Sequence, residues 1–267
     1  MMDTLFKNFN ENGFVILKDF LSNKVLSNSY KELKEETLLE FSKLTKDDMG
    51  GFISGNLNVF PGKYSQIFLD ALLENNLGNI IEKLSQKTLS EFNVLVGGNL
   101  NQQYVYNQHF HTDGGFDNEF LIVNVATEDV TEFNGPLEIA PGTHKNDLPY
   151  WKFVVHKKRK RILLSRGDII IRSSALWHRG TKNTSRKPRF LLAFTFRDKN
   201  KSELNSYNFN QININRSKSY LGKDNNEIKI YKNVFDSSLK GKIQENFYTR
   251  FSYLYSTARL LKSLIPK

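Results

Sequence analysis

The stretch of sequence that decides the fold is RGDIIIRSSALWH, residues 166–178. Its start, Arg166-Gly167-Asp168, predicts a turn, because glycine adopts turn dihedrals readily. The three isoleucines that follow are β-branched residues, which are typical of a buried sheet strand. The run leads to His178, so we expect this imidazole, a common metal ligand, near the end of a strand.

A second motif, His111-Thr112-Asp113, offers two further ligands. Side chains of residues i and i+2 in a strand share a face, so His111 and Asp113 can converge on one metal ion. With His178 they make two imidazoles and one carboxylate, the facial set with open positions that suits non-haem iron(II). Structural zinc sites close all four positions, usually with thiolates, and the sequence contains no cysteine. An HxD triplet alone is common by chance, so its surroundings decide.

Helices precede strands along the chain. Ser22 predicts the start of an amphipathic helix whose apolar residues recur at near-helical spacing up to Leu44. Gln66–Leu73 and Leu77–Leu84 predict two further helical pieces, and from Glu91 onward the pattern predicts strands. This order predicts a mainly β (α+β) protein: a double-stranded β-helix, the jelly-roll or cupin-like barrel, with flanking helices.

Glycine and proline mark turns between the expected strands. Asn134-Gly135-Pro136-Leu137 and Pro141-Gly142-Thr143-His144 predict two tight turns around a short strand. Gly97-Gly98-Asn99 predicts an earlier turn. Two strand-like segments, 153–155 and 162–164, predict a hairpin whose connection is the basic run His156–Arg161.

The ordered motifs HxD, NGPL, PGTH, GD and WHRGxxNxSxxPR resemble those of the phytanoyl-CoA dioxygenase family of iron(II)- and 2-oxoglutarate-dependent oxygenases. Asn12–Ser22 is similar to that family's opening strand and first helix start. The likeness runs from about Phe9 to Phe196, and it is weak between Leu44 and Leu100. The C-terminal remainder matches no family that the motifs identify.

The resemblance implies that His111, Asp113 and His178 bind Fe(II), and that Arg189 binds the distal carboxylate of the co-substrate 2-oxoglutarate. A planar guanidinium can hold a carboxylate through two parallel hydrogen bonds, which lysine cannot reproduce. Arg189 begins the strand-like run Phe190–Phe196, whose alternation aims it into the barrel. The competitors Arg186 and Lys187 stand in a polar turn, and we expect Arg186 to be solvated.

Two positions at which members of this family carry different residues bear on the chemistry. Many relatives carry a serine two residues after the second histidine, where this chain has Gly180, so we expect Thr181 or Thr195 to supply a hydroxyl to the co-substrate. Related halogenases replace the metal-binding carboxylate with a small residue. The presence of Asp113 therefore favours a hydroxylase, which releases succinate and carbon dioxide as it oxidises its substrate with O2.

Other residues near the motifs are expected around the site. Tyr104 and Asn124 are predicted to bind co-substrate, the latter because a lone amide in an apolar strand needs a partner. Predicted substrate contacts, each with a purely structural role as the alternative, are His109, Tyr106, Phe116 and His144. We predict no catalytic side chain beyond the metal ligands. Gly114-Gly115-Phe116 is expected to open a loop across the site.

Length and composition set outer limits. We expect one oxygenase domain over residues 1–267, with the double-stranded β-helix and its N-terminal helices at 9–199. The N-terminus lacks the pattern of a secretory signal, and no apolar run approaches the about 18 residues that span a bilayer, so we expect a cytoplasmic protein. Absence of cysteine is compatible with a reducing interior.

The formal net charge is +10, and the densest basic cluster is His156–Arg161. A solvated hairpin tip is the simplest interpretation of this cluster, and a positive rim that attracts an anionic substrate is the next. No recognition module accompanies the charge, so we expect no nucleic-acid partner.

Residues 200–267 are expected to form a polar excursion followed by an amphipathic helix of the same domain. The predicted apolar stripe includes Leu239, Phe247, Leu254 and Leu261. We expect it to pack against the barrel or against a second subunit in a homo-oligomer. Because basic residues accompany the stripe, contact with a membrane surface is the alternative.

Three functions of different classes are compatible with the sequence. The first is an iron(II)/2-oxoglutarate dioxygenase that hydroxylates, or otherwise oxidises, a small metabolite. The second is a noncatalytic barrel that binds a ligand, and the third is a basic binding protein with an incidental triad. Succinate release coupled to O2 use distinguishes the first from the others.

Overall fold

The structure is a computed structural model that describes residues 2–43, 56–103, 107–108, 110–156, 158–201 and 229–232, and isolated positions between 251 and 264. Tyr104, Tyr106 and His109, which the sequence placed around the site, lie outside the described residues. Most of the C-terminal region, for which an excursion and a helix were predicted, also lies outside them.

Among the described residues, most helices precede residue 91 and most strands follow it, as expected from the sequence, with two short strands among the helices and one short helix among the strands. The helices are α1 (Met2–Asn12), α2 (Asn23–Ser42), α3 (Tyr64–Glu74), α4 (Leu77–Ser85) and α5 (Tyr150–His156). The strands are β1 (Phe14–Leu17), β2 (Asn56–Phe60), β3 (Phe92–Asn101), β4 (Leu121–Val125), β5 (Leu137–Ile139), β6 (Lys160–Ile162), β7 (Ile169–Ser173), β8 (His178–Gly180), β9 (Arg189–Asp198) and β10 (Lys229–Lys232).

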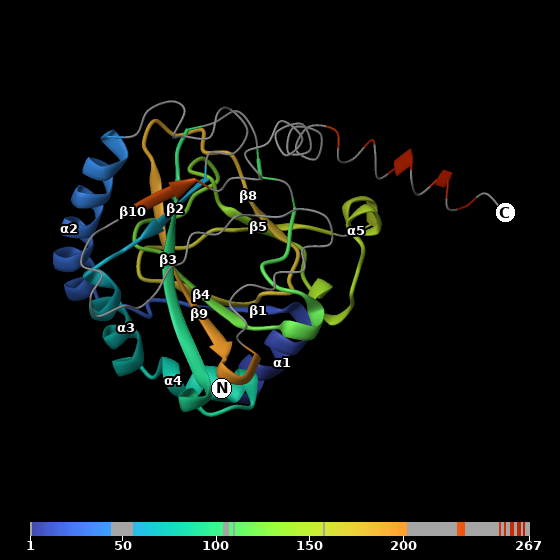
Figure 1. The fold of residues 1–267 in the computed structure, drawn as a ribbon, viewed down its shortest axis with the longest axis horizontal. Coiled ribbons are helices and arrows are strands. Elements are labelled where there is room, and N and C mark those ends of the chain that lie inside the picture. The colour runs from blue at the N-terminus through green and yellow to red at the C-terminus, as the bar shows by residue number, and fades with distance from the viewer. Residues whose placement is uncertain are drawn as a thin grey trace.

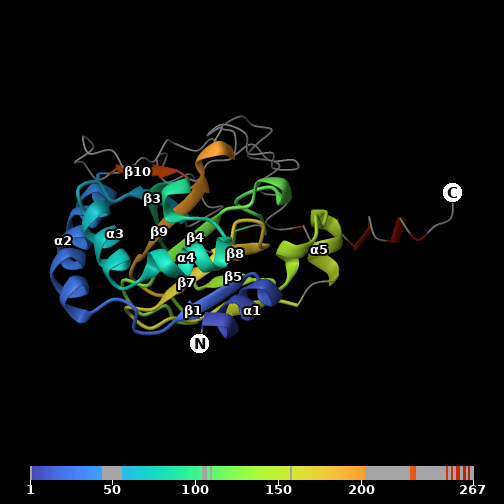
Figure 2. The ribbon, with the colours of Figure 1, turned by 90° about the horizontal axis from the view of Figure 1, so that it is seen from below.

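Two antiparallel sheets form the double-stranded β-helix. The larger has the order β1-β7-β4-β9-β3-β2-β10, and the smaller has the order β6-β5-β8. In both ribbon views α2 and α3 lie on the opposite side of the molecule from α5, which lies beside the smaller sheet (Figures 1 and 2). The predicted fold class is therefore confirmed.

Alternation along the strands separates two cores. In β9, Phe190, Leu192, Phe194 and Phe196 pack toward the helices, whereas Leu191 packs in the core shared by the two sheets. That second core consists of Ala126, Val130, Ile139, Ile162, Leu164, Ile170, Leu176 and Leu191. Because successive side chains point to opposite faces, Arg189, Thr195, Asn124 and Arg172 face the same interior as this second core.

The predicted helices are confirmed with small shifts of their ends. The helix predicted after Ser22 is α2, although the Ser22 side chain makes no capping hydrogen bond. The two predicted helical pieces are α3 and α4, separated by Asn75-Asn76, where Asn76 has a positive φ of 69°. No helix in the described parts of the chain is long and apolar enough to cross a membrane.

Two local predictions were wrong. Residues 153–155 belong to helix α5 instead of a strand, because Pro149 opens the first turn and Phe153 stacks on Trp177 at a centroid distance of 4.6 Å. The basic run is therefore no hairpin connection, and Lys160 and Arg161 lie in β6.

The predicted turn at Gly97-Gly98 was also wrong, since β3 runs straight through it. A Cβ on Gly98 would lie 2.8 Å from the Phe190 ring and 3.0 Å from the Leu191 carbonyl oxygen. Close packing of β3 against β9 explains this glycine.

Candidate metal centre

The three predicted metal ligands come together. An antiparallel bridge joins His111 to His178: the N–H of His111 donates to the His178 carbonyl at 2.9 Å, and the reverse bond is 3.0 Å. Two residues further on, the N–H of Asp113 donates to the Ser174 carbonyl at 2.8 Å. One potential ligand atom from each of His111, Asp113 and His178 lies within 4.8 Å of the other two. Backbone pairing thus positions all three side chains.

A hydrogen bond orients the His178 ring. Nδ1 of His178 lies 2.9 Å from the Leu176 carbonyl oxygen, so this nitrogen carries the proton and Nε2 keeps its lone pair. Nε2 lies 3.3 Å from Oδ2 of Asp113, on the side where His111 also lies. His178 is only 4% exposed, and this hydrogen bond holds its ring in an orientation that presents Nε2 to a metal ion.

The Asp113 carboxylate has a buried cation beside it. Nη2 of Arg172 donates to Oδ2 of Asp113 at 2.6 Å, and Nε of Arg172 donates to Oδ1 of Asn124 at 3.1 Å. Arg172 was not among the site residues predicted from the sequence. Its signal was present, because a cation at the end of the buried run Ile169–Ile171 needs a buried partner.

Arg189 fits a carboxylate ligand. Its side chain is 3% exposed, and burial lowers its pKa to about 10, which still leaves it protonated at neutral pH. Nη2 donates to the Gly135 carbonyl, and Nε lies 3.4 Å from the Asn134 carbonyl. Nη1 is buried and has no hydrogen-bond partner among the residues that the structure describes. A carboxylate bound at Nη1 would satisfy this orphaned donor.

Residues 9–191 match the family model described as phytanoyl-CoA dioxygenase (PhyH), which is well over half of the 267 residues. The chain belongs to the phytanoyl-CoA dioxygenase family. The match begins and ends close to the limits that the sequence motifs indicated. No curated protein sequence matches the chain.

Solved structures with the same fold include enzymes of natural-product biosynthesis. The epimerase SnoN, in complex with Fe3+, alpha ketoglutarate and nogalamycin RO, shares 17% identity with a TM-score of 0.55, over 74% of this chain and 83% of that chain. The carbocyclase SnoK shares 14% sequence identity with a TM-score of 0.58, and the match covers 73% of this chain and 83% of SnoK. EvdO2 from Micromonospora carbonacea var. aurantiaca, complexed with 2-oxoglutarate, shares 16% sequence identity with a TM-score of 0.57. The match covers 73% of this chain and 90% of EvdO2. At these identities the likeness shows the shared fold.

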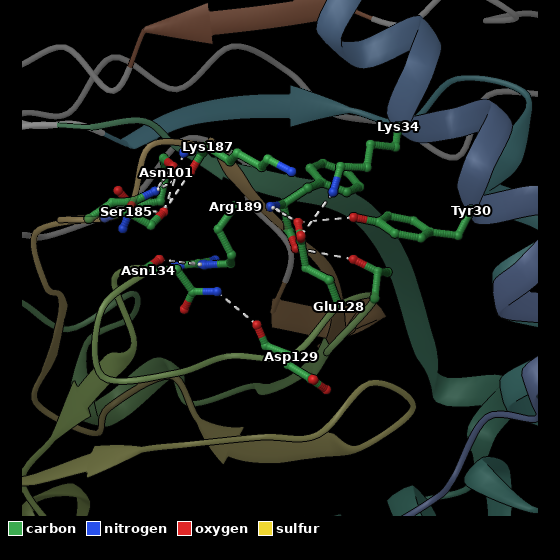
Figure 3. A network of polar contacts seen from close by, with 12 residues as sticks. Tyr30, Lys34, Asn101, Glu128, Asp129, Asn134, Ser185, Lys187 and Arg189 are labelled. Atoms are coloured by element: carbon green, nitrogen blue, oxygen red, sulfur yellow. Dashed lines mark hydrogen bonds and ion pairs between the residues drawn. The ribbon is translucent and has the colours of Figure 1, made fainter.

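Within this phytanoyl-CoA dioxygenase family member, a polar network holds the backbone around Arg189 (Figure 3). Asn101 donates to the Thr181 carbonyl at 2.9 Å, and Asn183 donates to the carbonyls of Asn101 and Lys187 at 2.8 Å and 2.9 Å. Gly135 has φ +81°, and a Cβ there would lie 2.1 Å from Nδ2 of Asn101. The glycine of the NGPL motif is therefore required by both conformation and space.

On the other side of Arg189, Glu128 is held by Tyr30 and Lys34 of α2 (Figure 3). The Tyr30 hydroxyl donates to Oε1 of Glu128 at 3.1 Å, Lys34 donates to Oε2 at 2.9 Å, and the Phe190 N–H donates to Oε1 at 3.0 Å. Burial raises the pKa of Tyr30, and the Glu128 charge raises it further. Glu128 is thus paired with Lys34, and its charge also acts on Arg189, whose pKa it raises against the larger effect of burial.

The other predicted co-substrate residues have protein partners. The Thr181 hydroxyl donates to the Pro136 carbonyl at 2.7 Å, and the Thr195 hydroxyl donates to the Leu95 carbonyl at 3.3 Å. Each hydroxyl can still accept a hydrogen bond. The partner that the Asn124 amide needed is Arg172, so Asn124 is linked to the metal-binding carboxylate. Their contacts with co-substrate stay predictions.

The predicted substrate residues that the structure describes lie in different places. Phe116 is exposed in a single turn of 3-10 helix that follows Asp113 closely. His144 is buried and packs between Phe9 and Gly13 of the N-terminal segment. These are packing contacts, and a substrate role for His144 stays a prediction. Arg186 is exposed, which confirms that expectation.

Proposed function

We propose that the protein is an iron(II)- and 2-oxoglutarate-dependent dioxygenase that hydroxylates a small, anionic metabolite. The observation that carries the proposal is the convergence of His111, Asp113 and His178. Buried Arg189 with its unpaired donor, and membership of the phytanoyl-CoA dioxygenase family, support the same conclusion. The cofactor is Fe(II), and the co-substrate is 2-oxoglutarate.

In this proposal, two imidazoles and one carboxylate hold one face of the metal ion and leave the other positions to ligands. Bound iron supplies the redox chemistry that activates O2 and removes hydrogen from the substrate. His178 presents Nε2 because its Nδ1 proton faces the Leu176 carbonyl. Arg189 binds the distal carboxylate of 2-oxoglutarate and so sets the orientation of the keto acid.

The overall reaction is balanced without a further reductant. 2-Oxoglutarate loses carbon dioxide and becomes succinate, and one atom of O2 enters its new carboxylate. The second atom enters the substrate between carbon and hydrogen. Asp113 occupies the position that halogenases leave to chloride, which favours hydroxylation over halogenation. The relatives named as an epimerase and a carbocyclase define alternative outcomes for the same oxidation.

Charge balance supports an anionic substrate. Among the residues that the structure describes, the carboxylate of Asp113 would partly balance the iron dication and the guanidinium groups of Arg172 and Arg189, because Glu128, which also acts on Arg189, is already paired with Lys34. The dianion of 2-oxoglutarate then leaves about one positive charge in a water-poor interior, where an unbalanced charge is unfavourable. An anionic group on the substrate would neutralise it. The net charge of +10 favours the approach of such a molecule.

The test is turnover of purified protein with Fe(II), 2-oxoglutarate and O2. Succinate release with matching O2 consumption is expected; without an organic substrate, ascorbate is added to reduce the second oxygen atom to water. His111→Ala should abolish it, whereas Arg186→Met, an exposed control, should keep the wild-type rate. Retained turnover in His111→Ala rejects the metal assignment. A product that gains one oxygen atom identifies hydroxylation, and a product without added oxygen identifies epimerisation or ring closure.

The second interpretation, a noncatalytic barrel, predicts ligand binding with no succinate under any condition. The third, a basic binding protein, predicts no metal affinity. Measuring metal binding and succinate release on one preparation therefore separates all three functions.

A further inference from the structure

Arg172 is a charged side chain in the interior between the sheets. All five residues of β7 are buried, and Arg172 is 5% exposed. Alternation puts Ile169 and Ile171 toward the helices, and Ile170 with Arg172 toward the second core. A guanidinium in such a place is unfavourable by several kcal/mol unless its donors are satisfied, on the order of the penalty for any buried ion. Nε and Nη2 have protein partners, whereas Nη1 has none among the residues that the structure describes.

Those partners connect strand β4 to the metal centre. Ile122 of β4 is the cross-strand neighbour of Arg172, and Asn124 is its diagonal neighbour on the same face. Nε donates to Asn124 at 3.1 Å, and Nη2 donates to Asp113 at 2.6 Å. Because a guanidinium is planar and rigid, fixing Nε on Asn124 also fixes the direction in which Nη2 points.

Asp113 needs such a restraint. The torsion that rotates an aspartate carboxylate has a broad distribution, so backbone position alone does not fix its oxygens. Its backbone is held by the Ser174 carbonyl, and Oδ2 is held by Arg172. A carboxylate has about four lone-pair sites, so it can accept from Arg172 and bind a metal ion at once.

We propose that Arg172 is a positioning residue: with Asn124 it holds the Asp113 carboxylate in the orientation that completes the metal site with His111 and His178. The proposal rests on the proposed function only in requiring that the triad binds a metal. It assigns Arg172 a role separate from that of Arg189. On β9, Arg189 lies six residues before Thr195, which is about 20 Å of extended strand. Thr195 pairs with Ile122, and Ile122 pairs with Arg172.

Two physical effects oppose each other at Arg172, and they predict opposite results. Hydrogen bonds that orient a metal-binding carboxylate strengthen metal binding, and their loss weakens it by about 10- to 100-fold. The positive charge of Arg172 repels a divalent ion, and its removal strengthens binding. The Asp113 carboxylate contacts Arg172 and would screen the repulsion between the guanidinium and a metal ion bound to the same carboxylate. We therefore expect the loss of orientation to outweigh the loss of repulsion.

The experiment measures Mn(II) binding to the apoprotein by calorimetry, without 2-oxoglutarate. Arg172→Met should weaken binding by about 10- to 100-fold. Arg186→Met, which removes an exposed arginine, is the control and should bind Mn(II) within about twofold of wild type. Mn(II) binding by Arg172→Met as tight as wild type, or tighter, overturns the proposal.

Further variants keep the result decisive if Arg172→Met does not fold. Asn124→Leu removes the anchor but keeps the guanidinium, and it should weaken Mn(II) binding by about tenfold. Unchanged affinity in Asn124→Leu also overturns the proposal. Arg172→Lys keeps the charge but cannot bridge Asn124 and Asp113, so it should remain weakened if orientation matters.

A spectroscopic signature separates orientation from general loosening. The visible absorption of Co(II) bound to the protein reports its coordination geometry. It should change in Arg172→Met and keep the wild-type shape in the exposed control Arg186→Met. An unchanged Co(II) spectrum in Arg172→Met contradicts the positioning role. A wild-type protein that binds neither metal refutes the proposed function itself, which is a distinguishable failure.

Discussion

Replacing Arg189 tests the co-substrate assignment most sharply. Arg189 is 3% exposed and ends in a donor, Nη1, without a partner in the described chain. Removing one partner of a buried charge pair costs about 3–5 kcal/mol, because the other charge is left uncompensated. Arg189→Met should therefore weaken 2-oxoglutarate binding on the order of 10²- to 10⁴-fold.

Arg189→Lys separates charge from geometry. Lysine keeps the positive charge but offers no planar fork, so one charge-assisted hydrogen bond of about 1.5–3 kcal/mol is lost. Binding should weaken by about 10- to 100-fold. The burial-lowered pKa of about 10 leaves the wild-type guanidinium charged at neutral pH, so the comparison is between two cations.

The assay is calorimetric titration of 2-oxoglutarate into Mn(II)-loaded protein without O2. Arg186→Met is the matched control, since Arg186 is exposed and stands three positions before Arg189. Its affinity should stay within about twofold of wild type, as usual for an exposed site without contacts. If Arg189→Met binds 2-oxoglutarate within threefold of wild type, the proposed carboxylate site is wrong.

Two other predictions concern the scaffold. Gly135→Ala puts a Cβ 2.1 Å from Nδ2 of Asn101 at a φ of +81°, so thermal denaturation should show a Tm lowered by at least about 3 °C. The control is Gly115→Ala, whose new Cβ has no atom within 4 Å, and its Tm should be close to that of wild type. Equal Tm values for the two variants refute the steric account. Burial lowers the pKa of His144, so the unfolded chain binds more protons and stability falls as pH decreases from about 7 to 5. Urea denaturation should show a shallower loss for His144→Gln, and an equal loss contradicts the burial of a neutral ring.

Much of the metal centre could be predicted from local pattern. His111 and Asp113 share a face by the two-residue period of a strand, and the isoleucines after Asp168 indicated the strand β7 that precedes His178. The pairing of His111 with His178 depends on a bridge between distant segments. Motif order, rather than spacing, supplied that link.

The partners of residues that act through three-dimensional neighbours were not predictable, even where, as for Arg172, the sequence indicates that a buried partner is needed. Arg172 needed the register of β4 and β7, which places it beside Asn124, and the backbone of Asp113, which brings the carboxylate within reach. Asn101 and Asn183 support Arg189 through backbone carbonyls, which carry no sequence signal.

Short apolar runs explain the wrong local predictions. Residues 153–155 have the β-branched and aromatic composition of a strand, but the stacking of Phe153 on Trp177 stabilises a short helix there. The composition of Gly97-Gly98 is typical of a turn, and only the close approach of the Phe190 ring and the Leu191 carbonyl across the sheet shows why a side chain is excluded at Gly98.

The most direct test of the central claim is anaerobic addition of 2-oxoglutarate to Fe(II)-loaded protein while visible absorption is recorded. The account predicts a saturable iron-to-keto-acid charge-transfer band with one iron per chain, present in Arg186→Met and absent in His111→Ala. A wild-type protein that binds iron without developing this band, or a His111→Ala variant that develops it in full, contradicts the assignment of His111, Asp113 and His178 as the metal ligands.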